Sequence, residues 1–188
     1  YVGGSAFAFM NCTALKTFEI PSCVKSIAPG LFMNSGITSV ELGVDGSTTA
    51  ITLGAFAFSG CKDLTSFVSH QKIAIIDRSA FDGCISLTEA IFADGTTTIN
   101  ANAFRNCRNL ANLNLSMEAV IKIDTGAFAG CTALPGLDVY DKVTTLGAGA
   151  FDGWGAGQTI RFIGLTSPSE KWNEAWDEGC SATLKWDA

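Results

Sequence analysis

The sequence predicts a solenoid of about seven coils, each roughly 23 residues long and each adding one short strand to a parallel sheet. Three observations support this prediction. A phenylalanine recurs at almost constant spacing, Gly or Asn follows it two residues later, and the residues beyond alternate between apolar and polar. A fixed period of roughly 20–50 residues is typical of stacked repeats, in which each coil buries its apolar face only against its neighbours.

The phenylalanine anchors define the coils. Their spacings are 23, 26, 23, 23, 24 and 23 residues, and Ala precedes every anchor except one, which follows Leu31. The Gly or Asn two positions later tolerates left-handed backbone and so favours a turn. We therefore expect each anchor to lie in the core beside a turn. The anchors are Phe9, Phe32, Phe58, Phe81, Phe104, Phe128 and Phe151.

Other positions repeat around each anchor and complete the unit. Cys stands three residues after the anchor in five units, Leu stands six residues after it in five units, and an aliphatic residue stands five residues before it in six units. Beyond the Leu, apolar residues recur at every second position, as in Leu113 and Leu115, which indicates a half-buried strand. Short turns or helical turns then close the opposite side of each coil.

The repeated unit Ala-Phe-x-Gly-Cys-x-x-Leu-Thr, seen at 57–65 and 80–88, resembles the BspA-like (Treponema-type) leucine-rich repeat family over residues 5–154. The resemblance implies a leucine-rich-repeat solenoid. Members are mostly surface or secreted proteins of anaerobic bacteria and some parasitic protozoa, and several are adhesins for extracellular-matrix or host-cell proteins. It therefore implies an extracellular or cell-surface location and a host or matrix protein as partner, although a fold does not fix a function.

The repeat pattern ends near Trp154, which replaces Cys, and Gly157 stands where Leu is expected. We predict a leucine-rich repeat array over residues 1–154 and a C-terminal capping unit over 155–188, which resembles the Trp-containing unit that closes many such arrays. The longer stretch Gly43–Ala50 follows a degenerate second unit and is expected to be a loop insertion between coils.

Composition argues against several classes of partner. The net charge is −6, and the 12 Lys and Arg residues are scattered along the chain, which disfavours nucleic acid and anionic membranes. No apolar run approaches the roughly 20 residues that a spanning helix needs, so we expect no membrane insertion. Without an initiator Met or a signal peptide at Tyr1, the chain is expected to begin inside a longer protein.

The seven cysteines are predicted to be structural. Five occupy the same repeat position, where they should stack as a ladder of small buried side chains, and only Cys23 and Cys180 fall outside it. No Cys-x-x-Cys pair offers the ligand spacing of a zinc site. Neither a metal nor any other cofactor is expected.

Catalysis has no support in the sequence. His70 is the only histidine, and no nucleophile and orienting group surround it in a known arrangement, so it is interpreted as an exposed loop residue. Asp45 and Asp94 each precede Gly in a turn dipeptide without the pattern of a calcium loop. The Gly-rich stretch 147–153 lacks the Lys-Ser/Thr of a phosphate loop. We expect a protein that is not an enzyme.

Partner recognition is expected on the outward positions of the strands, because the inward positions are fixed by the repeat and a one-residue slip would bury the polar set. This face is acidic towards its ends and apolar in the middle, at Val68 and Ile91. Its predicted residues are Thr17, Glu19, Ser39, Glu41, Ser66, Val68, Glu89, Ile91, Asn112, Asn114, Asp138 and Tyr140.

Three functional hypotheses remain. The first is a surface adhesion or protein-interaction module that uses the strand face. The second is a structural spacer that projects another domain. The third is a carbohydrate-binding or cell-wall-attached unit in which Trp172, Trp176 and Trp186 stack on sugars, although bulky aromatic residues also suit a cap over an open core end.

Overall fold

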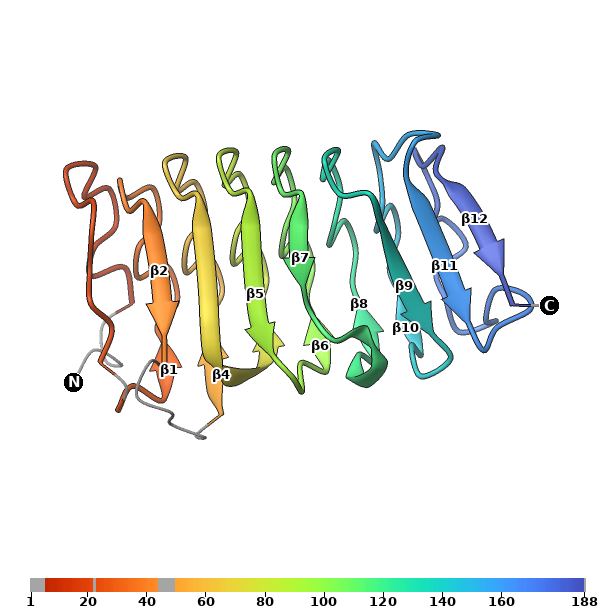
Figure 1. Ribbon diagram of the computed structural model, residues 1–188, viewed down its shortest axis with the longest axis horizontal. Coiled ribbons are helices and arrows are strands. Elements are labelled where there is room, and N and C mark those ends of the chain that lie inside the picture. The colour runs from red at the N-terminus through yellow and green to blue at the C-terminus, as the bar shows by residue number, and fades with distance from the viewer. Residues whose placement is uncertain (1–5, 22, 44–49, 188) are drawn as a thin grey trace.

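The computed structural model describes residues 6–21, 23–43 and 50–187. Figure 1 shows a single row of stacked coils that runs from the N-terminal to the C-terminal end. Strands provide the regular structure, and one short 3-10 helix, η1 (Met117–Ala119), is the sole helix in these ranges. The predicted solenoid is confirmed. The predicted loop insertion falls largely on residues 44–49, which lie outside the described residues.

Each regular coil has a front strand and, on its returning side, a shorter back strand. We call the two sets the front sheet and the back sheet. The front strands are β2 (Ser39–Leu42), the first part of β4 (Ser66–Ile76), β5 (Glu89–Ala93), β7 (Asn112–Asn114), β9 (Gly136–Tyr140), β11 (Thr159–Ile163) and β12 (Thr183–Trp186). The back strands are β1 (Ser26–Ile27), β3 (Ile51–Leu53), the end of β4, β6 (Thr98–Ile99), β8 (Lys122–Ile123) and β10 (Thr145–Leu146).

The front strands show the expected period of two. In β2, buried and exposed residues alternate, with Val40 and Leu42 inward and Ser39 and Glu41 outward. All pairings are parallel, as stacked coils of one direction require. The back strands were not part of the prediction. Each contains the aliphatic residue five positions before an anchor, for example Ile99. The side chain of Ile99 is buried, and its strand pairs with that of Ile123 in the next coil.

The anchors form a continuous stack of rings through the core. Successive rings from Phe9 to Phe151 have centroids 5.2–6.1 Å apart and planes within 12° of parallel. The six anchors from Phe32 onward are fully buried, whereas Phe9 is only partly buried. Aromatic faces stacked with this offset add specific attraction to the burial of apolar surface. The stack therefore runs without interruption from Phe9 to Phe151.

The cysteine ladder is buried and also hydrogen-bonded. Each thiol from Cys61, Cys84, Cys107 and Cys131 donates to the carbonyl oxygen of the anchor in the preceding coil, over 2.9–3.1 Å. The interpretation of these residues as merely small and apolar was therefore incomplete. It was wrong for Cys12, which is exposed.

The front sheet is divided at Pro135, although the back sheet is not. In the intact part, a backbone N–H at the start of each front strand donates to the preceding coil: Thr65 N to Thr38 O, Thr88 N to Thr65 O, and Ala111 N to Thr88 O. Pro135 occupies the next position and has no N–H to donate. In the described ranges β9 pairs with β11 and not with β7.

Beyond residue 154, the chain continues to coil. β11 and β12 add to β9 in parallel register, with Thr159 opposite Thr183. Ala175-Trp176-Asp-Glu-Gly179-Cys180 repeats the anchor motif with Trp in place of Phe and one extra residue. Trp176 is buried and meets the Phe151 ring edge-on at 6.4 Å. The assignment of 155–188 as a separate capping unit stays a prediction.

Candidate partner-binding face

The front sheet arranges the predicted residues in two outward rows. Strand register places Ser39, Ser66, Glu89 and Asn112 side by side, and it does the same for a second row. The second row is Glu41, Val68, Ile91 and Asn114. Because these rows cross four hydrogen-bonded strands, their side chains share one rigid surface.

The predicted residues differ in accessibility. Six are exposed: Thr17, Glu19, Ser39, Glu41, Asn112 and Asn114. Six are half-buried: Ser66, Val68, Glu89, Ile91, Asp138 and Tyr140. The predicted apolar middle is therefore a small patch, in which Val68 and Ile91 are register partners that partly cover one another.

Two groups of predicted residues depart from these rows. Thr17 and Glu19 lie in the first coil, where the described chain forms no strand. Asp138 and Tyr140 lie on β9, across the break in the sheet. There Asp138 accepts two hydrogen bonds from Arg161, at 2.6 and 2.7 Å, so its carboxylate is already neutralised by the neighbouring strand.

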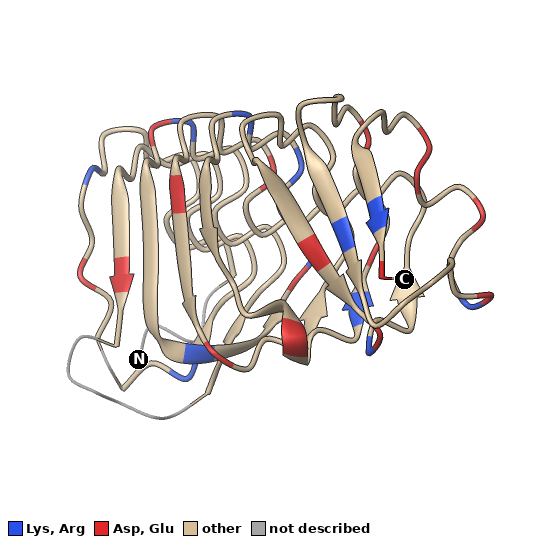
Figure 2. Ribbon diagram, turned by 45° about the vertical axis from the view of Figure 1, so that its right-hand side comes forward, with Lys and Arg blue, Asp and Glu red and all other residues tan. Residues whose placement is uncertain are grey.

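Charge on the front face is sparse and mixed in sign. Figure 2 shows isolated acidic positions towards the N-terminal end and an acidic, basic, basic succession across β9, β11 and β12. Register identifies that succession as Asp138, Arg161 and Lys185. This distribution of charged side chains contains no continuous basic stripe of the kind that binds a phosphate backbone.

The break between β7 and β9 opens a groove of about 560 Å³ on this face. One wall is formed by β7 and η1, with Leu113 and Glu118, and the other by Pro135 and β9, with Leu137. Beyond β9 the lining continues to Arg161 on β11 and Lys185 on β12. Leu113 and Leu137 are half-buried, whereas the inward residues on β4 and β11, Phe67 and Ile160, are fully buried. Sequence analysis missed this groove, and its signal was Pro135 at a position where strands need an N–H donor.

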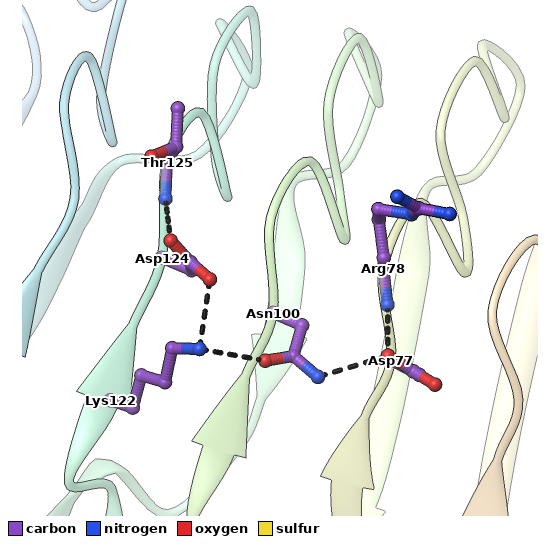
Figure 3. A network of polar contacts seen from close by, with 6 residues as sticks. All are labelled: Asp77, Arg78, Asn100, Lys122, Asp124 and Thr125. Atoms are coloured by element: carbon purple, nitrogen blue, oxygen red, sulfur yellow. Dashed lines mark hydrogen bonds and ion pairs between the residues drawn. The ribbon is translucent and has the colours of Figure 1, made fainter.

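A chain of polar contacts joins three coils near the back sheet (Figure 3). Asn100 donates to Asp77 at 2.9 Å and accepts from Lys122 at 3.2 Å. Lys122 also pairs with Asp124 at 2.9 Å, and Asp124 accepts from the backbone N–H of Thr125 at 2.7 Å. Each of these polar groups has a hydrogen-bond or ion-pair partner, so the network holds adjacent coils together.

Among the described residues, His70 and the buried cysteine thiols do not form a nucleophile–base pair. His70 lies within β4, so its predicted loop position was wrong; it is exposed, with Nε2 3.0 Å from Oε1 of Glu41 on β2. Burial raises the pKa of the Cys84 and Cys107 thiols well above the ordinary value and that of Cys131 to about 12. A thiol becomes nucleophilic when its pKa falls, and these have moved in the opposite direction.

Two further features are absent from the described part of the chain. No group of three or more His, Cys, Asp or Glu side chains there could hold a metal ion. No helix in the same residues is long and apolar enough to cross a membrane.

The tryptophans predicted to cap the array or to bind sugars are largely covered. Trp172 and Trp176 are buried, and Trp172 donates from Nε1 to Val143 O at 2.9 Å. Trp186 is half-buried, with its ring stacked 3.9 Å from that of Phe162. A hollow of about 760 Å³ lies beside the three indoles. Most of their ring surface is thus used in packing, which leaves little for a sugar.

Comparison with solved structures supports the fold. A leucine-rich repeat protein from Bacteroides ovatus superposes with a TM-score of 0.60 at 18% identity, over 95% of this chain and 49% of that one. A leucine rich cell surface protein from Faecalibacterium prausnitzii gives 0.52 at 22% identity, over 97% and 62%. A leucine-rich repeat protein from Eubacterium ventriosum gives a TM-score of 0.50 at 21% identity, over 80% of this chain and 44% of that one. The chain thus spans 44–62% of the length of these proteins.

Sequence comparison identifies the repeat itself. No functionally curated protein matches the chain. The profile of the BspA type leucine rich repeat region, in contrast, matches in six copies over residues 5–64 and 51–171. These two ranges cover most of the sequence and every phenylalanine anchor. The chain belongs to the BspA-type leucine-rich repeat family.

Proposed function

We propose that this chain is a non-catalytic protein-recognition module of a cell-surface or secreted protein, of the adhesin type, and that it contacts its partner through the front sheet. The observation that carries the proposal is the contrast between the two sides of each front strand. Inward residues repeat from coil to coil, whereas outward residues in one row change from Glu41 to Val68 to Ile91 to Asn114. A rigid scaffold that displays varied side chains is suited to recognition.

The chemistry of this face supports a protein partner. Its polar residues surround a small apolar centre, as at many transient protein interfaces, and its open shape lacks the enclosed pocket that small-molecule chemistry uses. A surface location is consistent with the family and with the structural relative named as a leucine rich cell surface protein. A host or extracellular-matrix protein is the partner class we propose.

The test is binding of the purified chain to immobilised fibronectin, fibrinogen and a glycan panel at physiological salt. The test variant is Glu89→Lys/Ile91→Asp, which changes the middle of the front sheet. Its matched control is Glu178→Lys/Ile121→Asp, with the same replacements at exposed positions away from that sheet.

We expect saturable protein binding that the control variant retains and the test variant loses. Equal loss in both variants would contradict a front-sheet site. Binding to glycans alone would favour the carbohydrate hypothesis, and absence of all binding would favour a structural spacer.

A further inference from the structure

We propose that the groove between β7 and β9 accepts a short extended segment of a partner polypeptide, which adds a strand to the divided front sheet. The inference deepens the proposed function, on which it rests, by naming a second and more specific contact site. It depends on three features: the width of the opening, an unused hydrogen-bond acceptor, and the side chains that line it.

The opening is wider than the spacing of two paired strands. Paired strands lie about 4.8 Å apart, so a gap that holds one extra strand must be about twice as wide. No Cα atom of β7 lies within 8 Å of a Cα atom of β9. Figure 1 shows β9 diverging from β7 towards its C-terminal end, where η1 bounds the opening. The space therefore suits about three residues of extended chain, the length of β7.

The coils on either side of the groove remain tightly joined elsewhere. The Phe104 and Phe128 rings stack at 5.4 Å, Cys131 donates to Phe104 O at 3.0 Å, and β6 pairs with β8. The opening is thus a local feature of the front sheet on a rigid frame. A preformed site of this kind avoids part of the ordering cost of binding.

Pro135 leaves one acceptor of the front ladder unused. The carbonyl oxygens of Thr38, Thr65 and Thr88 each accept a backbone N–H from the next coil, and Ala111 O is the next in this series. Within the described ranges, no backbone N–H donates to Ala111 O. An added strand could supply that donor, as in β-strand addition, where main-chain hydrogen bonds provide affinity and pockets for alternate side chains provide specificity.

The lining defines the chemistry of the occupant. Half-buried Leu113 and Leu137 present apolar surface between the walls, which suits an aliphatic side chain directed inward. Of the charged lining residues, Glu118 and Lys185 are exposed and make no ion pair with a described residue, whereas Asp138 is paired with Arg161. An extended segment that alternates aliphatic with hydroxyl side chains, and that directs a basic side chain towards Glu118 and away from Lys185, fits this arrangement best.

The probe for the test is a fluorescent nine-residue peptide, Thr-Val-Lys-Val-Thr-Val-Lys-Val-Thr, titrated with the whole chain in fluorescence polarisation. Its control has the same sequence with N-methyl groups on alternate amides, which removes the donors along one edge. We expect saturable binding of the first peptide and none of the second. In isotope-labelled protein, amide resonances of β7, η1 and β9 should shift on titration.

Two variants test the electrostatic part of the site. Glu118→Lys should weaken binding of the probe about two- to fivefold at low salt, the range of an exposed charge pair. Glu178→Lys changes the net charge equally but lies outside the groove, and should leave the affinity unchanged. Both positions are exposed, so neither replacement threatens the fold.

Several results would overturn the proposal: no binding of the probe, equal binding of the N-methylated peptide, or shifts confined to other strands. The outcomes separate it from the proposed function, since Glu89 and Ile91 do not line the groove. If protein binding depends on Glu89 and Ile91 but the probe peptide does not bind, only the groove proposal is rejected. Probe binding without recognition of any immobilised protein would reject the adhesive function alone.

Discussion

The indole Nε1 of Trp154 donates to the carbonyl oxygen of Phe128 at 3.0 Å, and so takes the place that a cysteine thiol holds in four preceding coils. The same carbonyl oxygen accepts the backbone N–H of Cys131 in its own coil at 3.1 Å. Each anchor carbonyl thus joins a turn within one coil to a side chain of the next. The recurring cysteine is therefore a small donor that fits a buried acceptor, and tryptophan is a larger solution to the same requirement.

Replacing Trp154 by Phe should lower the free energy of unfolding by about 2–3 kcal/mol, because it removes this hydrogen bond and leaves unfilled space in the core. Urea unfolding followed by circular dichroism measures the change. Glu178→Gln, an exposed replacement, is the control and should change it by less than about 0.5 kcal/mol. A Trp154 variant as stable as the control would contradict a structural role for the indole.

The phenylalanine anchors should contribute to the free energy of unfolding according to how deeply each ring is buried. Phe81→Ala removes a fully buried ring that stacks on both neighbours, and should cost about 3–5 kcal/mol. Phe9→Ala removes a partly buried ring and should cost clearly less. The comparison is made by denaturant unfolding of the two variants. A cost below about 1 kcal/mol for Phe81 would be inconsistent with the stacked core.

The buried thiols predict a loss of stability at alkaline pH. Burial raises the pKa of Cys131 from 9.0 to about 12 in the native state, so the thiol ionises first in the unfolded chain. Stability from this group is complete below pH 9, and falls as the pH rises towards 12. Unfolding free energies measured over this window should fall more steeply for the wild type than for Cys131→Ala. Equal slopes would show that Cys131 ionises as readily when folded.

The polar chain near the back sheet predicts an acid-side effect. Burial tends to raise the pKa of Asp124, but hydrogen bonds from Lys122 and Thr125 outweigh it and hold the pKa below its usual range. The charged carboxylate therefore stabilises the native state above the ordinary aspartate range, and this stability is lost as pH falls through the lowered pKa.

Lys122→Met should reverse the shift, since burial would then act with less opposition. Carboxyl carbon NMR titration of Asp124 in the two proteins measures it, and Lys185→Met, on the front sheet, serves as the control. An unchanged pKa in Lys122→Met would mean that Thr125 alone holds the carboxylate charged.

Local sequence was sufficient for the repeating parts of this protein. The anchor spacing, the Gly or Asn beside each turn and the alternation after each Leu are local consequences of stacking, so they predicted the solenoid and the outward rows of β2, β4, β5 and β7. Tertiary contacts decided the rest. The donor role of Cys61, the strand position of His70 and the back strands depend on neighbouring coils, which a single repeat does not contain.

The sequence by itself determined which residues face inward, because the apolar period is nearly the same in every coil. Only the tertiary structure decided where the face would open. Pro135 differs from its counterparts Thr88 and Ala111 by one missing N–H, but its effect appears only when two coils lie side by side and the carbonyl of Ala111 meets no donor. A single lost hydrogen bond between coils is not visible in the pattern within one coil, and here it accompanies a groove in an otherwise regular sheet.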